Sequence, residues 1–80
     1  MTLGELTLDR PAAIVGVGGP APLARRLQAM GFLPGAPVRV VQVAPLGDPI
    51  TVDLDGWRVS LRRSEASLLE VRPELEGAAP

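Results

Sequence analysis

Few side chains in this sequence could carry out catalysis. The 80 residues include no histidine, cysteine, lysine or tyrosine, so no ordinary base can activate the hydroxyls of Ser60, Ser64 and Ser67 as nucleophiles. Pairs of carboxylates could act as acid and base, but the nine acidic residues are spread along the chain at positions typical of a surface. A domain of this length has no room for a deep cleft around them. The sequence therefore predicts that the protein is not an enzyme.

A glycine-rich segment at residues 16–19 has some features of a phosphate-binding loop. Its sequence, Gly-Val-Gly-Gly, is not followed by the Lys-Ser/Thr pair that would hold phosphate and magnesium. A turn at the end of a strand explains these glycines better.

Asp53 and Asp55 are the carboxylates whose spacing comes closest to that of a metal site. If one strand ran through Asp55, both side chains would share a side and could hold magnesium or calcium weakly. A hairpin turn with a cross-strand ion pair between Asp53 and Arg58 explains the same residues and is preferred. Because the chain offers neither imidazole nor thiolate, we expect no specific iron site and no cofactor.

Composition limits the partners and the location of the protein. The net charge of -1 argues against nucleic-acid binding, because such binding needs a basic surface. No apolar stretch approaches the roughly 20 residues of a membrane span, and the start of the chain lacks the pattern of a signal peptide. The prediction is a cytoplasmic protein that does not insert into a membrane.

A short helix that stops abruptly is the clearest motif of the first half. Pro22 suits the start of a helix over residues 23–30, and the apolar stripe of that helix consists of Leu23, Leu27 and Met30. Gly31 can adopt the left-handed conformation that ends a helix. Pro34-Gly35 then fits a tight turn. We therefore expect structural roles for Met30, Gly31, Pro34 and Gly35.

Two places outside the expected core could bind a partner. Arg25 and Arg26 lie off the apolar stripe and could bind an acidic surface through forked hydrogen bonds, although a solvated helix face explains them equally well. Residues 44–49 form an expected loop around Gly47 and Asp48, which is either a simple turn or a contact loop. Arg25, Arg26, Gly47 and Asp48 are thus the predicted partner-binding residues.

Short apolar, β-branched segments predict about five strands, over residues 12–17, 37–43, 50–54, 57–61 and 68–72. Asp55-Gly56 predicts a two-residue hairpin turn. This turn sets a register that buries one face, which consists of Ile50, Val52, Leu54, Trp57, Val59 and Leu61. In the segment 37–43, valines occupy both faces, so either both faces are covered or a bulge shifts the phase.

The expected fold is mostly β, a small and strongly bent antiparallel barrel with one inserted short α-helix. Brief helical turns are expected at residues 2–5, which have a capping-box sequence, and at residues 64–66. Residues 1–73 are predicted to form a single domain. Residues 74–80, which are small and acidic, are predicted to form a frayed tail.

Three sequence blocks resemble one protein family. Arg25-Arg26-Leu27 is followed by Met30-Gly31-Phe32-Leu33-Pro34-Gly35, residues 44–50 read A-P-L-G-D-P-I, and Leu61-Arg62-Arg63 leads into Leu68-Leu69-Glu70-Val71. The blocks occur in the order found in the FeoA family, which comprises small cytosolic proteins of bacterial ferrous-iron uptake. The resemblance runs from about Leu3 to Val71.

The resemblance implies an SH3-like barrel and an accessory protein that regulates FeoB, a membrane ferrous-iron transporter with a cytosolic GTPase domain. The mechanism would be protein–protein contact without catalysis. One alternative is a metal-sensing or domain-docking module similar to the C-terminal barrel of diphtheria-toxin-repressor-type regulators, and another is a weak carboxylate metal carrier. An exposed strand edge could also pair two copies into a weak homo-oligomer.

Overall fold

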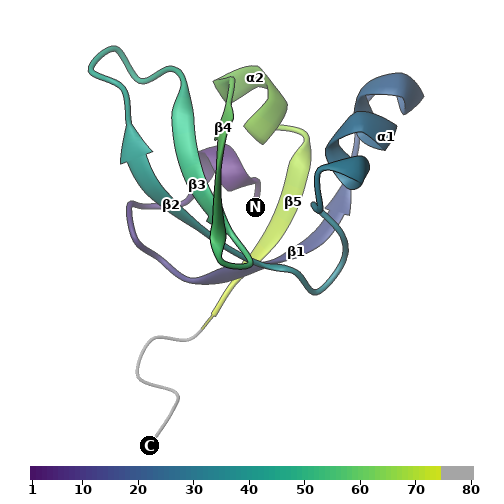
Figure 1. Cartoon of the computed structure of the whole chain (residues 1–80), viewed down its shortest axis with the longest axis horizontal. Coiled ribbons are helices and arrows are strands. Elements are labelled where there is room, and N and C mark those ends of the chain that lie inside the picture. The colour runs from purple at the N-terminus through teal and green to yellow at the C-terminus, as the bar shows by residue number, and fades with distance from the viewer. Residues whose placement is uncertain (75–80) are drawn as a thin grey trace, which may run out of the picture.

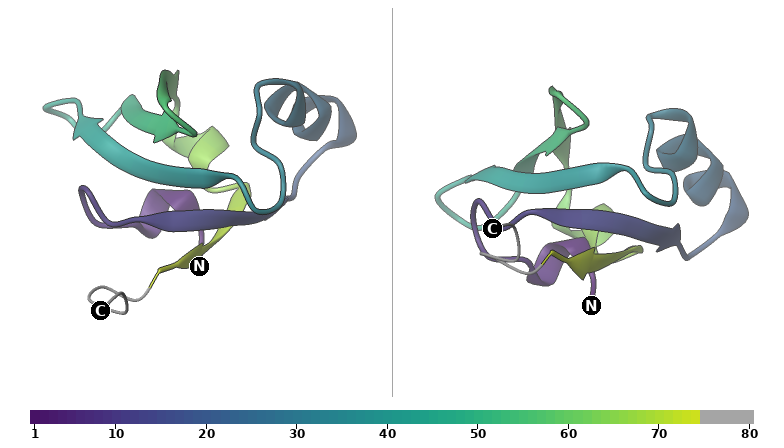
Figure 2. Two further views of the ribbon diagram at one scale, coloured as in Figure 1. Left: turned by 60° about the horizontal axis from the view of Figure 1, so that its bottom comes forward. Right: turned by 90° about the horizontal axis from the view of Figure 1, so that it is seen from below.

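The computed structural model describes residues 1–74, in which five antiparallel strands form one strongly bent sheet (Figures 1 and 2). The strands are β1 (Ala12–Val17), β2 (Pro37–Val43), β3 (Ile50–Leu54), β4 (Trp57–Leu61) and β5 (Leu69–Pro73), and their order across the sheet is β4-β3-β2-β1-β5. The three helical elements are η1 (Leu3–Glu5), α1 (Ala21–Ala29) and α2 (Arg63–Ala66). The mostly β prediction with one inserted helix is thereby confirmed.

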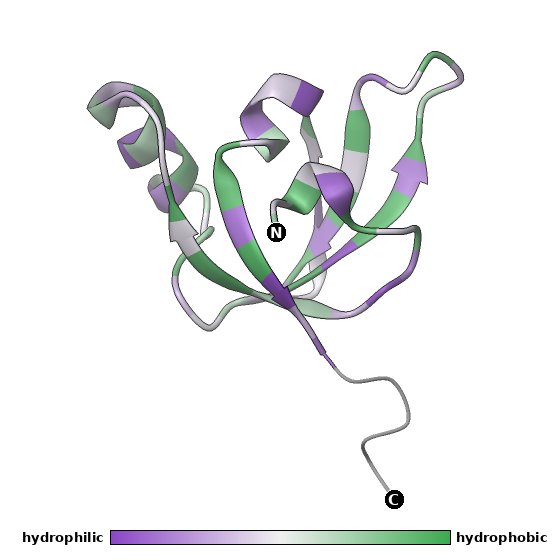
Figure 3. Cartoon of the chain, turned by 180° about the vertical axis from the view of Figure 1, so that it is seen from behind, coloured by the Kyte–Doolittle hydropathy of each residue, from purple (hydrophilic) through white to green (hydrophobic). Residues whose placement is uncertain are grey.

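A single apolar core lies between the strands and the helical elements. Alternate residues of the strands contribute to it, and Figure 3 shows the resulting alternation of hydropathy along the chain. Leu27 of α1 and Phe32 are fully buried, whereas Leu23 and Met30 are partly buried and pack against the same core. The predicted apolar stripe is therefore the packing face of α1.

The helix stop has the predicted backbone. Helix α1 begins at Ala21, two residues before the predicted start, and Met30 is its C-cap. Gly31 follows with a φ of 112°, a conformation that side chains with a Cβ atom rarely adopt. Gly35 has a φ of 89°, and the N–H of Ala36 donates to the carbonyl of Leu33 at 2.9 Å across the turn. The chain thus passes from α1 to β2 through two positive-φ glycines.

The β3–β4 hairpin has the predicted turn and register. Asp55 and Gly56 both have positive φ, 50° and 97°, as the two-residue turn requires. Leu54 pairs with Trp57, and the register continues to the pair Ile50 and Leu61. The predicted burial of Trp57 is wrong, because its side chain is 58% exposed. Trp57 begins β4, which is an edge strand, so no further strand covers its outer side.

The valines of β2 are accommodated by a bulge. The pairing of β2 with β3 shifts register between Val40 and Gln42, which lets Val38 and Val40 face the core while Val43 is 41% exposed. A second shift occurs between Ile14 and Gly16, where β1 pairs with β5. Bulges of this kind increase the local bend of a strand.

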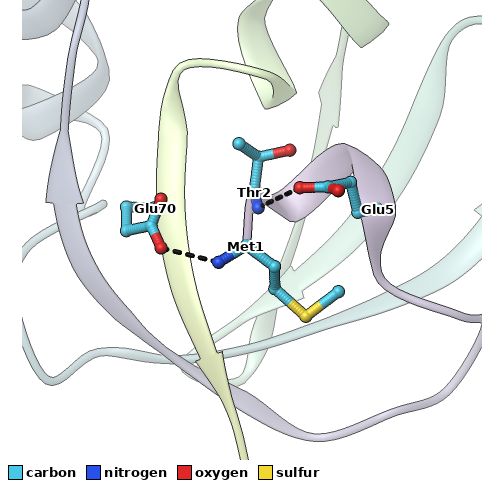
Figure 4. Close-up of polar contacts among 4 residues, drawn as sticks. All are labelled: Met1, Thr2, Glu5 and Glu70. Carbon is cyan, nitrogen blue, oxygen red and sulfur yellow. Dashed lines mark hydrogen bonds and ion pairs between the residues drawn. The ribbon is translucent and has the colours of Figure 1, made fainter.

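The first residues of the chain cover the outer edge of β5. Thr2 forms a β-bridge with Glu70, and the N–H of Val71 donates to the carbonyl of Met1 at 2.8 Å. The Met1 amino group donates to Oε2 of Glu70 at 2.7 Å (Figure 4), and this hydrogen bond raises the pKa of the amino group. The Glu5 carboxylate accepts the Thr2 N–H at 2.7 Å, as the capping box predicted, and hydrogen bonding by Thr2 lowers the pKa of Glu5.

Two further predictions concern the C-terminal tail and membrane-spanning segments. The predicted tail, residues 74–80, lies outside the described residues except for Glu74. Within residues 1–74, no helix has both the length and the apolar character needed to span a membrane.

Candidate partner-binding surface

The loop of residues 44–49, which joins β2 to β3, presents the most exposed large apolar side chain of the described chain. Leu46 is 97% exposed. The loop is closed at its base, where the Ala44 N–H donates to the Pro49 carbonyl at 3.1 Å, and at its tip, where the Gly47 N–H donates to the Ala44 carbonyl at 2.7 Å. The glycine and prolines therefore do build a turn, but the turn holds an unpacked leucine in solvent.

Arg63, the first residue of α2, fixes this loop to the rest of the domain. Its Nε donates to the Gly47 carbonyl at 2.9 Å, and its Nη1 donates to the Gly4 carbonyl at 3.2 Å. Its backbone N–H donates to Oδ1 of Asp48 at 3.0 Å. Gly47 and Asp48, which were predicted to contact a partner, are thus occupied by bonds within the chain. They position the loop, and Leu46 is left as its projecting group.

The two arginines of α1 differ in a way that the sequence did not indicate. Nη2 of Arg26 forms an ion pair and a hydrogen bond with Oε2 of Glu65 in α2. Arg25 is exposed and makes no hydrogen bond or ion pair with any residue between 1 and 74. Of the two predicted partner-binding arginines, Arg25 is available, and Arg26 ties α1 to α2.

Helix α2 therefore connects both predicted contact elements. Arg63 bonds to the 44–49 loop and Glu65 bonds to α1, although α2 has only four residues. Figure 1 shows α2 between the β2–β3 loop and α1, with all three on the same side of the molecule. We call this side, defined by residues 44–49, α2 and the arginines of α1, the α2 surface.

The hairpin acids take part in different interactions from those expected. The predicted ion pair between Asp53 and Arg58 is wrong: Oδ1 of Asp53 accepts the Gly56 N–H at 3.0 Å, and Oδ2 lies 4.0 Å from Nη2 of Arg39. Arg39 approaches from the neighbouring strand β2, to which Asp53 also pairs. Asp53 thus stabilises the turn and links β2 to β3.

A shallow groove of about 260 Å³ lies beside this hairpin. The charged residues that line it are Asp53, Asp55, Glu74 and Arg39. Among residues 1–74, no three histidine, cysteine or acidic side chains come together in a way that could hold a metal ion.

Three residues of the α2 surface were missed at the sequence level. Leu46 had a usable signal, because it is a large apolar residue in a segment otherwise built from turn residues. Arg63 lies in one of the family-like blocks, but no pattern indicated its bonds or those of Glu65, because their partners lie 16 and 39 residues away. The residues that hold the predicted contact elements in place were therefore not predicted.

Comparison with known proteins identifies the family. Residues 1–73 match the family model described as the FeoA domain. A fused Fe(2+) transport protein A/Fe(2+) transporter FeoB of Porphyromonas gingivalis is 42% identical over 71 residues, which cover 89% of this chain. The chain spans only 8% of the length of that fusion protein.

Solved structures of similar proteins share the fold. The FeoA protein of Chlorobium tepidum is 36% identical, with a TM-score of 0.87 over 98% of this chain and 76% of that one. FeoA of Stenotrophomonas maltophilia, solved with zinc and described as a procaryotic SH3 domain protein, is 38% identical, with a TM-score of 0.79 over 90% of this chain and 89% of that one. A manganese-dependent transcriptional repressor, at 17% identity and a TM-score of 0.84 over 36% of its length, shares the fold alone.

The match over nearly the whole described chain and the similarity to several FeoA structures agree with the three sequence blocks. The bent five-stranded sheet is the SH3-like fold of these proteins. The chain belongs to the FeoA domain family.

Proposed function

We propose that this protein regulates an FeoB-type iron transporter by binding to its cytosolic side. The observation that carries the proposal is the Porphyromonas gingivalis relative, in which an FeoA part and an FeoB part belong to one polypeptide. Joining two modules raises the effective concentration of each for the other. A separate FeoA protein would achieve the same contact through its own surface.

The α2 surface is the part of the molecule that we assign to this contact. Leu46 offers an apolar group that none of residues 1–74 covers, and Arg63 holds its loop in place without a partner. A preorganised loop loses little conformational entropy when it binds. Arg25 adds an available guanidinium, which can bind a carboxylate through two parallel hydrogen bonds.

The proposed mechanism requires no chemistry from this chain. Binding would bias either the nucleotide handling or the assembly of the transporter, and FeoB would supply the catalytic groups.

The direct test is co-purification of this protein with FeoB from the same organism, with and without guanine nucleotide. Leu46→Ser and Arg25→Glu should each weaken recovery of FeoB, and the effect of Arg25→Glu should be larger at low salt, where charges are least screened. Leu8→Ser, which changes a leucine that is 56% exposed, and Arg72→Glu, which changes an exposed arginine of β5, are the matched controls. If FeoB is not recovered with the wild-type protein under any nucleotide condition, the proposal is wrong.

The metal-carrier alternative has a separate test. Calorimetry with ferrous iron under anaerobic conditions, and with zinc as a second probe, measures the affinity directly. Tight one-to-one binding of iron would favour the metal-carrier function. We do not expect it, because the acidic side chains of residues 1–74 do not come together in a metal site.

A further inference from the structure

The two edges of the sheet differ in whether their outer backbone groups are paired. The outer edge of β5 is covered by Met1 and Thr2. Strand β4, at the other edge, pairs only with β3. Within the described chain, no backbone hydrogen bond from outside the sheet reaches residues 57–61. Strand β4 contains no proline and no bulge, and Arg58 is the charged residue that protects this edge from uncharged strands.

The register identifies which backbone groups point away from the sheet. In an antiparallel pair, opposed residues alternate between pairs that exchange hydrogen bonds and pairs that do not. The two-residue turn makes Leu54 and Trp57 a bonded pair, so Arg58 and Ser60 belong to the pairs that do not exchange bonds with β3. Their N–H and C=O groups therefore point outward, along the open edge.

The hydrogen bonds of β3 on its other side support this assignment. The Asp55 N–H donates to the Pro37 carbonyl of β2 at 3.0 Å. By the same alternation, Asp53 exchanges hydrogen bonds with Arg39 of β2, and the backbone of Asp53 is directed away from β4.

The side chains along the open edge carry uncompensated positive charge. Arg58 lies opposite Asp53, but Asp53 is bound to the Gly56 N–H and lies beside Arg39. The side chains of Arg58 and Arg62 make no hydrogen bond or ion pair with any residue from 1 to 74. Trp57 adds an indole that is 58% exposed at the start of the strand.

We propose that β4 is a docking site for an extended acidic segment of a partner protein, which adds to the sheet as a sixth strand. The backbone of the segment would bond to Arg58 and Ser60, as in other cases of strand addition. Alternate carboxylates would bind Arg58 and Arg62, and an apolar residue would cover Trp57. This inference goes beyond the proposed function by adding a second contact outside the α2 surface, and it depends on that function for the partner to be FeoB.

Charge disfavours a second copy of this chain in one register. Antiparallel pairing of two β4 strands about Ser60 would place Arg58 of each copy opposite Arg62 of the other, and like charges directly opposed across strands are destabilising. Pairing about Val59 would instead place Arg58 opposite Ser60, which compensates neither arginine. An acidic segment compensates both, and the concentration dependence in the test below distinguishes it from a second copy.

The test uses the full-length protein and a synthetic seven-residue peptide of alternating glutamate and valine. Binding is measured by fluorescence anisotropy, and the site is located by backbone amide chemical shifts. Two control peptides are matched in length: one has lysine in place of glutamate, and the other keeps glutamate but carries N-methyl groups that block backbone pairing. Shifts are expected at Arg58 and Ser60 for the unmodified acidic peptide alone.

Charge reversal at Arg58 and Arg62 together should weaken binding by about tenfold, or about 1.4 kcal/mol, because two exposed charge pairs are replaced by repulsive ones. Arg72→Glu, on β5, should leave it unchanged. The inference is overturned if the acidic peptide does not bind, if the N-methylated peptide binds equally well, or if the shifts lie outside β4. It is also overturned if concentration alone shifts the β4 amides, because a second copy would then be the occupant.

This experiment separates the inference from the proposed function. If the protein captures FeoB but does not bind the peptide, the proposed function is supported and the β4 site is wrong. If the protein binds the peptide through β4 but does not capture FeoB, the β4 site is supported and FeoB is not the partner.

Discussion

Nε of Arg63 and the carbonyl oxygen of Gly47 lie 2.9 Å apart, although 16 residues separate them in the sequence. This contact fixes the β2–β3 loop against α2, together with the bond from the Arg63 backbone to Asp48. The loop that presents Leu46 is therefore rigid because of a residue in a different element.

Replacing Arg63 tests this arrangement. Arg63→Ala removes the two side-chain donors to Gly47 and Gly4, and the free energy of unfolding should fall by about 1–2 kcal/mol. Arg62→Ala, next to it, removes a side chain that has no such bond in the described chain, and should change stability by no more than about 0.5 kcal/mol. Urea unfolding measures both. Equal stability of the two variants would show that Arg63 does not anchor the loop.

The two arginines of α1 should respond differently to charge reversal. Arg26→Glu places a second carboxylate beside Glu65, whose side chain is only 14% exposed, and should cost about 1 kcal/mol, or roughly 4–8 °C in melting temperature. Arg25→Glu should leave the melting temperature nearly unchanged. In Glu65→Gln, the charge is removed but an oxygen remains for the Arg62 N–H, so Arg26→Glu should cost clearly less in that background. An equal cost in both backgrounds would argue against the pair.

Gly31 should be the glycine least tolerant of a side chain in the α1–β2 connection. At Gly31, an added Cβ meets a positive φ and lies 3.3 Å from Cδ2 of Leu54. At Gly35, the φ is also positive but nothing lies within 4 Å. Gly35→Ala should therefore lower the free energy of unfolding by about 1–2 kcal/mol through backbone strain. Gly31→Ala should lower it by more, and thermal unfolding measures both. Gly16→Ala, which has ordinary φ and open space, is the control and should be nearly neutral.

Trp57 should behave as an exposed residue. The chain has one tryptophan, so its emission maximum should be that of a largely hydrated indole, and iodide should quench it readily. Trp57→Ala should cost clearly less than the ~3–5 kcal/mol of a buried tryptophan, whereas Leu54→Ala, on the same face of the hairpin, should cost about 2–5 kcal/mol. A blue-shifted, unquenched emission would contradict the exposed position.

The capping box at the start of the chain predicts that the free energy of unfolding decreases at acidic pH. The pKa of Glu5 is lowered in the folded state by hydrogen bonding from Thr2, so the ionised carboxylate favours folding. That contribution is complete above the pKa of an unfolded glutamate, about 4.3, and is lost as the pH falls through the lower folded value. In Glu5→Gln this part of the pH dependence should be absent from melting curves recorded between pH 2 and 6. An unchanged profile would show that Glu5 is not the group responsible.

The comparison of sequence with structure shows where local patterns are sufficient. The β3–β4 register was predictable because the Asp55-Gly56 turn and the apolar alternation specify the same pairing. The exposure of Trp57 was not, because alternation indicates a face of the sheet but not whether the strand lies at its edge. The strand order places β4 at an edge, and that order depends on contacts distant in the sequence.

The candidate surface shows the same limit. The 44–49 loop and the α1 arginines were found from composition and spacing. Their bonds to Arg63 and Glu65 join residues from separate elements, and neither propensity nor periodicity encodes such pairs. The sequence therefore could not distinguish an exposed arginine, Arg25, from one already paired within the described chain, Arg26.

The coverage of one sheet edge by Met1 and Thr2 has a consequence for assembly. A sheet with two open edges can recruit copies on both sides and grow without limit, as in fibrils. Among residues 1–74, the β5 edge is already paired with the first residues of the chain, so copies of this protein cannot join β4 to β5 in a repeating series. Raising the protein concentration should therefore not produce filaments.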